Sequence, residues 1–201
     1  MDRMETLTQE IAAVAARMVV EDGMDYGSAK RRAGRQLGLA PRTALPDNEL
    51  LESAVREHLA LFHADTQPAE LAALRQLALL WMERLAEFRP HLAGAVWNGT
   101  ATRLSDIHLQ LFCDDPKSAE IALIDQRVDY QVRSVNGFHG AAVDALSFSV
   151  PCHDLGEVVG VHLIIHDHDD LRGALKPGAH GRAARGDRKA LLQCIDEESS
   201  G

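Results

Sequence analysis

The chain has 201 residues, of which 46% are hydrophobic and 25% are charged, and its formal net charge at pH 7 is −9. This composition is ordinary for a globular protein and excludes a collagen-like or largely disordered chain. The excess of acidic side chains also argues against a protein that coats nucleic acid through general electrostatic attraction.

Two further features bear on the compartment. No apolar run approaches the roughly 18 to 20 residues that a membrane-spanning helix needs, and residues 1–5 lack the basic-then-apolar order of a secretory signal. The cysteines Cys113, Cys152 and Cys194 are scattered and show no CxxC spacing. They therefore predict reduced thiols, with neither a disulfide framework nor a zinc knuckle. We expect a cytoplasmic protein that has no membrane partner.

The first ninety residues have the spacing of helices. The first predicted helix carries apolar residues at steps of four, three and four: Leu7, Ile11, Val14 and Met18. It is expected to stop near Gly23. A short basic helix is predicted over residues 28–37, and Asp47 can cap a third helix. The basic helix could contact a nucleic-acid backbone or be a solvated face through its cationic residues: Lys30, Arg31, Arg32 and Arg35.

The fourth predicted helix, which ends at Pro90, has the most regular apolar stripe. Its members follow one another at steps of three and four: Leu71, Leu74, Ala78, Trp81, Leu85 and Phe88. Such a stripe can be a coiled-coil seam, but it more often packs on the rest of its own domain. A buried Trp81 would identify it as core, and an exposed one would indicate a partner.

After Pro90 the period becomes that of strands. The apolar run 93–97 predicts a short strand that ends at the turn Asn98-Gly99. Residues 106–113 alternate between a polar side with Asp106, His108 and Gln110 and an apolar side. Further elements are strands over 130–135, 143–150 and 158–166 and helices over 116–125 and 187–195. The predicted class is α+β, with a helical module at 1–90 and a mixed-sheet domain at 91–201 that can share one core.

The stretch 95–112 contains an apolar run, Gly99-Thr100, a short loop and then Ser105-Asp106-Ile107-His108 on the alternating strand. It resembles the nucleotidyltransferase superfamily, which includes polymerase-β-like enzymes and aminoglycoside nucleotidyltransferases. That family's pattern is an apolar strand, Gly-Ser or Gly-Thr, a loop, and Ser-Asp-apolar-Asp (or Glu) on the next strand. A third carboxylate follows on a neighbouring strand. The resemblance implies a nucleotidyltransferase-like mixed sheet flanked by helices.

The resemblance also implies roles for the matching residues. Gly99 and Thr100, with Ser105, would bind phosphate, Asp106 would be the first metal-binding carboxylate, and Asp144 is the candidate for the later one. Residues two apart on a strand point the same way and lie about 6.6 Å apart. Two carboxylates so placed can hold two divalent metals against the phosphates of a nucleotide.

His108 stands where the family has its second carboxylate, so the chain departs from the pattern there. Magnesium prefers oxygen ligands, whereas imidazole suits zinc, manganese or iron. The expected metal ligands are Asp106, His108 and Asp144, which would hold magnesium, manganese or zinc. His108 would serve as an unusual ligand or as a general base.

Other patterns leave alternatives open. The segment 172–189 is basic and glycine-rich, so Arg182 and Arg185 could neutralise phosphate, or the segment could be a solvated loop. His166 and His168 share a face and could bind a metal or simply be polar residues at a strand end. No Ser-His-Asp triad, Walker loop or dinucleotide-binding glycine motif is recognisable.

These patterns predict metal-dependent binding of a nucleoside triphosphate, which would allow nucleotidyl transfer. The alternative from another class is a catalytically inactive relative that acts as an interaction or regulatory protein. It would bind a protein partner or a second copy through its helical half.

Overall fold

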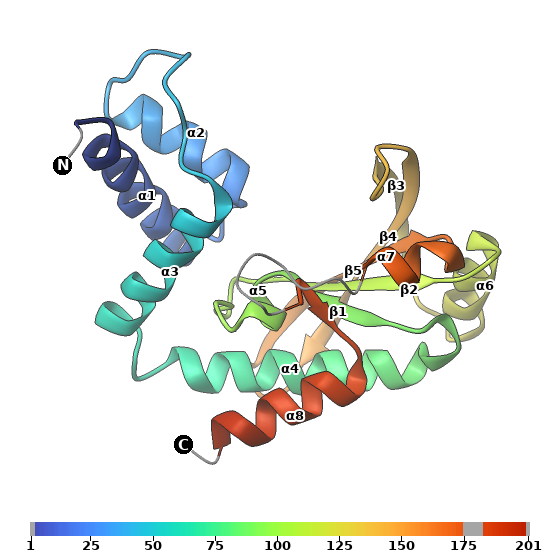
Figure 1. The fold of residues 1–201 in the computed structure, drawn as a ribbon. Helices are drawn as coiled ribbons and strands as arrows, with labels where there is room; N and C mark the ends of the chain where they lie inside the picture. The colour runs from blue at the N-terminus through green and yellow to red at the C-terminus, as the bar shows by residue number, and fades with distance from the viewer. Residues whose placement is uncertain (1–2, 175–182, 200–201) are drawn as a thin grey trace. The chain divides into compact units, whose positions relative to one another are not determined.

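A computed structural model describes residues 3–174 and 183–199 of the chain (Figure 1). The chain forms two compact units. The first contains residues 1–69 and 100–104, and the second contains residues 70–99 and 105–201. The first is helical and the second holds a mixed sheet flanked by helices, which confirms the predicted α+β class.

The first unit is built from three helices, α1 (Arg3–Asp22), α2 (Tyr26–Gln36) and α3 (Asn48–Phe62). Asp47 caps α3 as predicted, since its Oδ1 accepts a hydrogen bond from the Leu50 amide at 2.8 Å. The core of this unit includes the apolar faces of all three helices: Ile11, Ala15, Met18, Ala29, Ala33, Leu51, Val55 and Leu59.

The basic residues of α2 make contacts within the first unit. The Lys30 ammonium donates to the Pro46 carbonyl and to Asn48 Oδ1, both at 2.9 Å. It thereby holds the segment that leads into α3. Arg31 donates to Ser28 Oγ at 3.2 Å. These local contacts favour the interpretation of a structural, solvated helix face over that of a nucleic-acid surface.

Helix α4 (Gln67–Arg84) packs against the sheet of the second unit. Trp81 is 2% exposed, and its ring centroid lies 4.6 Å from that of Phe148. The stripe is therefore core, as predicted. The helix ends at Arg84, and Phe88 is buried in the short helix η1 (Ala86–Phe88) that follows. The boundary between the units falls after residue 69 and not after residue 90, because α4 packs on the sheet.

The described part of the second unit contains one six-stranded sheet in the order β3-β4-β5-β2-β1-β6. The strands are β1 (His91–Ala93), β2 (Ile107–Phe112), β3 (Gln131–Asn136), β4 (Ala142–Cys152), β5 (Glu157–His166) and β6 (Arg185–Gly186). Strands β2 and β5 pair in parallel, whereas every other neighbouring pair is antiparallel. Three strands agree with the predicted ranges 130–135, 143–150 and 158–166.

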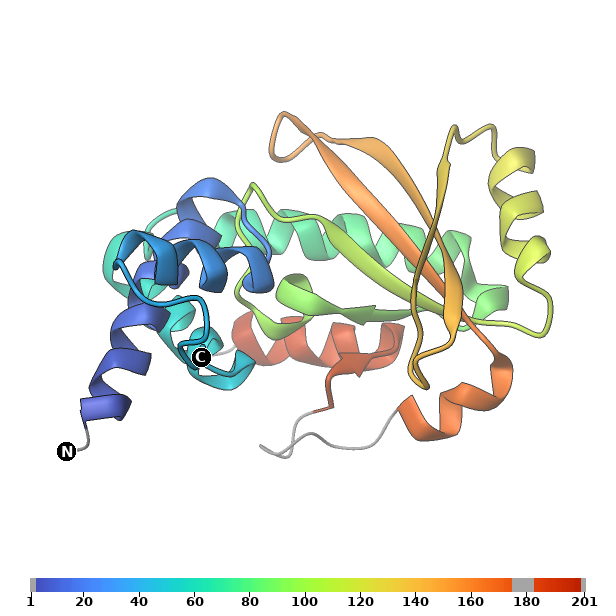
Figure 2. The same cartoon turned by 90° about the horizontal axis from the view of Figure 1, so that it is seen from above.

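The two faces of this sheet differ in chemistry. One is apolar and buried through alternate residues of the central strands: Ile107, Leu109 and Leu111 on β2 and Val161, Leu163 and Ile165 on β5. Helix α4 and helix α8 (Arg188–Ser199) lie on one side of the sheet (Figures 1 and 2). Helix α6 (Pro116–Asp125) spans the predicted residues and connects β2 to β3. The other face carries the alternating polar residues, which confirms the predicted alternation at Asp106, His108 and Gln110.

The strand predicted over 93–97 is wrong for most of its length. Strand β1 ends at Ala93, Gly94 has a φ of +71°, and Gly94–Asn98 form the short helix α5. The buried Arg75 stabilises the end of α5, because its Nε donates to the Val96 carbonyl at 3.1 Å. Its guanidinium also pairs with Glu198 of α8. Apolar residues in 93–97 resemble a strand in sequence, but a distant arginine supplies the partners for a helical turn.

We predict that Arg75→Ala lowers the free energy of unfolding of the second unit by about 2–4 kcal/mol, because buried carbonyls lose their donor. Urea unfolding followed by fluorescence would measure it, since the two tryptophans, Trp81 and Trp97, both belong to this unit. Arg84→Ala removes a cation that lies over the Trp81 ring and should lower the free energy of unfolding by less than about 1 kcal/mol. Equal effects of the two substitutions would contradict the role of Arg75.

Candidate functional site

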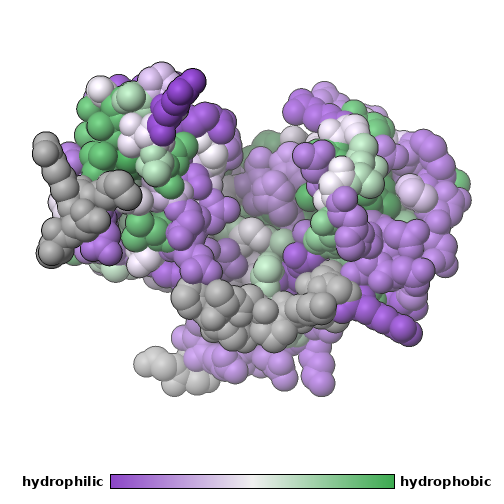
Figure 3. Space-filling view, turned by 45° about the horizontal axis from the view of Figure 1, so that its top comes forward, coloured by the Kyte–Doolittle hydropathy of each residue, from purple (hydrophilic) through white to green (hydrophobic). Residues whose placement is uncertain are grey.

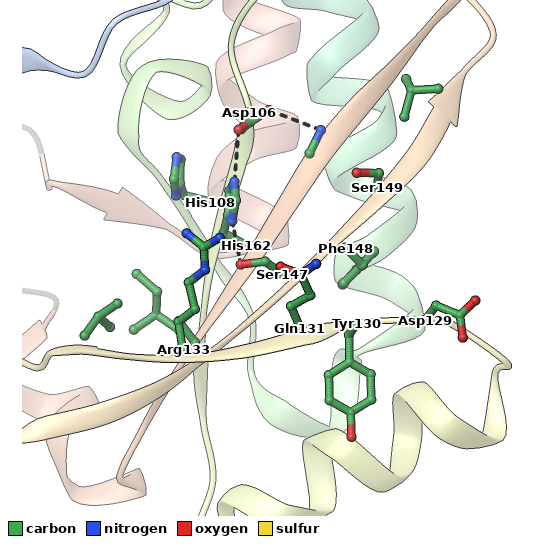
Figure 4. Close-up of a pocket in the computed structure, with 15 residues that line it drawn as sticks. Asp106, His108, Asp129, Tyr130, Gln131, Arg133, Ser147, Phe148, Ser149 and His162 are labelled. Carbon is green, nitrogen blue, oxygen red and sulfur yellow. Dashed lines mark hydrogen bonds and ion pairs between the residues drawn. The ribbon is translucent and has the colours of Figure 1, made fainter.

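A row of polar side chains crosses four strands on the open face of the sheet. His108 of β2 is opposite His162 of β5, His162 is opposite Ser147 of β4, and Ser147 is opposite Gln131 of β3. Directly opposed residues of neighbouring strands point to the same face of a sheet. Figure 4 shows these side chains together, with Asp106 at the start of β2 next to them.

Asp106, His162 and Ser147 form a continuous chain of hydrogen bonds. One oxygen of Asp106 accepts from the Gly160 amide at 3.1 Å, and the other lies 3.0 Å from His162 Nε2. The second ring nitrogen, Nδ1, lies 2.8 Å from Ser147 Oγ. Because an ionised carboxylate only accepts, Nε2 of His162 carries a hydrogen and donates it to Asp106, while Nδ1 and the Ser147 hydroxyl share the second hydrogen bond.

A hydrogen bond and burial set the ionisation of Asp106 and His108. The hydrogen bond from His162 is the largest cause that lowers the pKa of Asp106, while partial burial raises it by less. Burial lowers the pKa of His108, and the proximity of His162 lowers that pKa further. The rings of His108 and His162 stack with centroids 4.9 Å apart. Asp106 is therefore an anion and His108 a neutral imidazole near pH 7.

An open groove of about 1030 Å³ lies over this row. Its walls include Asp106, His108, His162 and Ser147, together with residues of β3 such as Gln131 and Arg133. In Figure 4 the Arg133 side chain extends from β3 towards His162 and Ser147. The groove thus combines two carboxylates (Asp106 and Asp129), two imidazoles, the guanidinium of Arg133 and three hydroxyls, those of Ser147, Ser149 and Tyr130.

Asp144 does not join Asp106 and His108, which corrects the expected set of metal ligands. Residues alternate between faces along a strand. Ser147 lies in the groove, and Asp144 is three positions away on β4, paired with Ser134 of β3. Asp144 therefore shares the opposite face with Leu146 and Phe148. The position of Asp144 in the sequence fits the family's third carboxylate, but its side chain lies on the face of the sheet away from the groove.

Gly99 and Thr100 lie outside the groove. Gly99 has a φ of +82° and ends α5, where a Cβ would lie 3.5 Å from the Arg75 guanidinium. Thr100 is buried and belongs to the first unit. The polar row has two neighbouring glycines: Gly94, where a Cβ would lie 3.6 Å from His108 Cδ2, and Gly160, where it would collide with the Asp106 carboxylate. Ser105 directly precedes Asp106 and is partly buried.

Of the two candidate phosphate contacts in the basic segment, Arg182 lies outside the described residues. Arg185 of β6 lies over the Phe138 ring at 4.5 Å, and desolvation lowers its pKa. Phe138 stacks on His166 with centroids 3.9 Å apart, and Phe112 stacks on the same histidine. Arg185 and His166 therefore belong to an aromatic cluster, and neither is among the residues that line the groove.

The sequence analysis did not identify His162, Ser147 or Arg133 as functional residues. Each lies on a predicted strand, so their alternation was visible, but the neighbour of each strand was not. The Ser-His-Asp chain also corrects the expectation that no such arrangement is present. Such arrangements are recognised by geometry, because their order and spacing in the sequence vary between folds.

No model of a known protein family matches the chain, and no curated protein sequence matches it. No helix in residues 3–174 and 183–199 is long and apolar enough to cross a membrane. The function therefore has to be argued from the side chains of the site.

We predict that acid destabilises the second unit from about pH 6.5 downward. Burial is the largest cause that lowers the pKa of His91, His108 and His166. A folded pKa below the unfolded value means that the unfolded chain binds more protons. The stability is therefore complete above the unfolded pKa and is lost as pH falls towards the folded one.

Urea unfolding at pH 7.5 and 5.5 would measure this loss, at up to about 1.4 kcal/mol per pH unit for each histidine that stays neutral. His108→Gln should flatten the pH dependence. His153→Gln, at an exposed position, should leave it unchanged. Equal stability of the wild-type protein at both pH values would contradict the prediction.

Proposed function

We propose that the second unit is a nucleotidyltransferase-like domain whose polar groove binds the phosphates of a nucleotide. The order of its elements supports this proposal. Strand β1 is followed by Gly94 and a connecting segment, and Ser105-Asp106-Ile107-His108 then leads into the neighbouring strand β2. This is the order that the resemblance implies, with Gly94 in place of Gly99 as the glycine that ends the first strand.

The donor set on the two central strands decides whether the groove fits the metals that the resemblance implies. The superfamily pattern has three carboxylates, whereas this chain has Asp106, His108 and, on the adjoining strand, His162. Magnesium prefers oxygen ligands. Among the described residues, the ligand atoms of these three side chains also do not all converge within 4.8 Å. The residues present therefore do not fit the pair of magnesium ions that the resemblance implies.

The observation that carries the proposal is the guanidinium of Arg133 in the wall of the groove, which offers a phosphate contact without added metal. A site of three carboxylates repels phosphates until bound cations reverse its charge. Here two carboxylates line the groove, and one of them, Asp106, is hydrogen-bonded to His162 and the Gly160 amide. Arg133 adds a guanidinium to the wall, and guanidinium binds phosphate oxygens in a bidentate manner. We therefore expect nucleotide binding that persists when magnesium is removed.

The side chains have separate roles in this proposal. Asp106 and Ser147 fix the orientation of His162, because each is hydrogen-bonded to one of its two ring nitrogens. His108 stacks against that ring and limits its movement. Arg133 supplies the charge that a phosphate needs. Two-metal nucleotidyl transfer is not part of the proposal, and metal-dependent binding through Asp106 and His108 stays a prediction that the same experiment tests.

Calorimetric titration of ATP, GTP, CTP and UTP, in EDTA and then with magnesium, manganese or zinc, tests the proposal. We expect binding in EDTA that Arg133→Gln weakens by about tenfold, the cost of one charge-assisted contact. The control is Arg84→Gln, a cation that does not line the groove.

Asp106→Asn separates the two modes of binding. Removing its negative charge should preserve or strengthen phosphate binding in EDTA, whereas a metal-dependent site should lose its affinity. Binding that requires metal and is lost in Asp106→Asn would restore the metal-dependent interpretation. No binding of any nucleotide under any condition would refute the nucleotide proposal.

A second candidate function is an interaction role of the first unit, in which the chain binds a second copy of itself. The Trp81 stripe cannot serve it, because that face is buried. Instead, Leu61 and Phe62 of α3 are 68% and 69% exposed. Figure 3 shows apolar residues at the surface of the first unit.

We predict that Leu61→Ser with Phe62→Ser shifts any dimer to monomer, because an apolar contact would be lost. Sedimentation velocity measures the change. The control is Ile121→Ser, at a residue that is 56% exposed in the second unit. A wild-type protein that stays monomeric over a wide concentration range would argue against self-association.

A further inference from the structure

We propose that Glu21, His58 and His63 form a binding site for a divalent transition metal, zinc first, in the first unit. One carboxylate oxygen and one nitrogen from each imidazole all lie within 4.8 Å of one another. Glu21 lies in the last turn of α1, and both histidines lie at the end of α3. The site involves no residue of the groove and is independent of the proposed function.

The end of α3 brings the two histidines together. Residues five apart on a continuous helix point about 140° apart around its axis. Helix α3 stops at Phe62, and His63 leaves the helical conformation with a φ of −131° while its amide still donates to the Leu59 carbonyl. The His63 ring then lies beside that of His58, with centroids 5.8 Å apart.

The third ligand comes from α1. The core of the first unit packs α1 against α3 through residues such as Met18 and Leu59. Glu21 follows Met18 by three positions, so it lies near the same side of α1. Its Oε1 is 3.3 Å from His58 Nε2.

The orientation of the His58 imidazole and the Glu21 carboxylate favours a metal ion bound by both over a direct hydrogen bond between them. His58 Nε2 is completely buried, yet it forms no hydrogen bond of acceptable geometry with any described residue. The imidazole and the carboxylate are therefore close without pointing at each other. A buried polar atom that makes no hydrogen bond calls for an explanation, and a bound ion is one of the few available.

The donor set matches zinc. Two imidazoles and one carboxylate are ligands that zinc accepts in tetrahedral sites, and three protein ligands leave one position for water. Glu21 and His58 also line a cavity of about 480 Å³ next to Phe62, which leaves room for that water. A metal there would connect the ends of α1 and α3, and its binding energy would add to the stability of the first unit.

Zinc titration of the full chain, after treatment with EDTA and removal of the chelator, tests the proposal by calorimetry. Cobalt(II) in place of zinc reports geometry through its visible absorption. We expect one site with a tetrahedral cobalt spectrum. His63→Ala and Glu21→Gln should each weaken zinc binding by at least about tenfold, since even second-shell changes cost that much. Zinc should raise the melting temperature of the wild type but not that of His63→Ala.

The controls separate this site from the groove and from unfolding. His153→Ala removes an exposed histidine of the second unit, and Asp106→Asn removes the groove carboxylate; both should bind zinc like the wild type. His58→Ala could unfold locally because His58 is partly buried, so His63→Ala and Glu21→Gln carry the test. Zinc binding that survives both, or that only Asp106→Asn abolishes, would overturn the proposal whatever the nucleotide titrations show.

Discussion

The parallel pairing of β2 with β5 places the polar residues of the second unit. It sets His108 beside His162 and brings Asp106 to the Gly160 amide. A shift of one residue in this pairing would turn one strand over and expose its apolar face. Leu109 and Leu163, opposite each other in the register, are completely buried. The burial of the apolar face therefore also determines the composition of the polar one.

The two proposed sites use the same kinds of side chain, carboxylate and imidazole, in different states. In the groove, Asp106 and His162 are hydrogen-bonded to each other, and Ser147 completes the chain. At the ends of α1 and α3, Glu21 and His58 are close but not aligned. In the groove these polar atoms are already paired, so the proposed anion contact comes from Arg133. A convergent group with an unsatisfied nitrogen suits a cation. The difference in geometry, and not in residue type, leads to two different proposals.

Much of the fold could be predicted because it depends on local patterns. The period of the apolar residues located α1 and α4, and the cap Asp47 located the start of α3. The alternation at 106–113 located β2 and the polar side with Asp106 and His108. The exceptions depend on distant partners. Residues 94–98 are helical, and Arg75, about twenty positions earlier, binds their carbonyls. Asp144 lies on a strand that contributes to the groove, but its side chain is on the opposite face of the sheet, so it is not a residue of the site.

The sequence by itself determined most of the helices and strands, though not α5, and which of their residues share a face, because these follow from repeats of 3.6 and two residues within one segment. Only the tertiary structure decided which strands are neighbours. His162 is 56 positions from Asp106, and no local pattern connects them. Their contact follows from placing β5 next to β2, a choice governed by burial of the whole apolar face. The polar face of each strand could therefore be predicted from the sequence, but which polar residues of different strands meet in the groove could not.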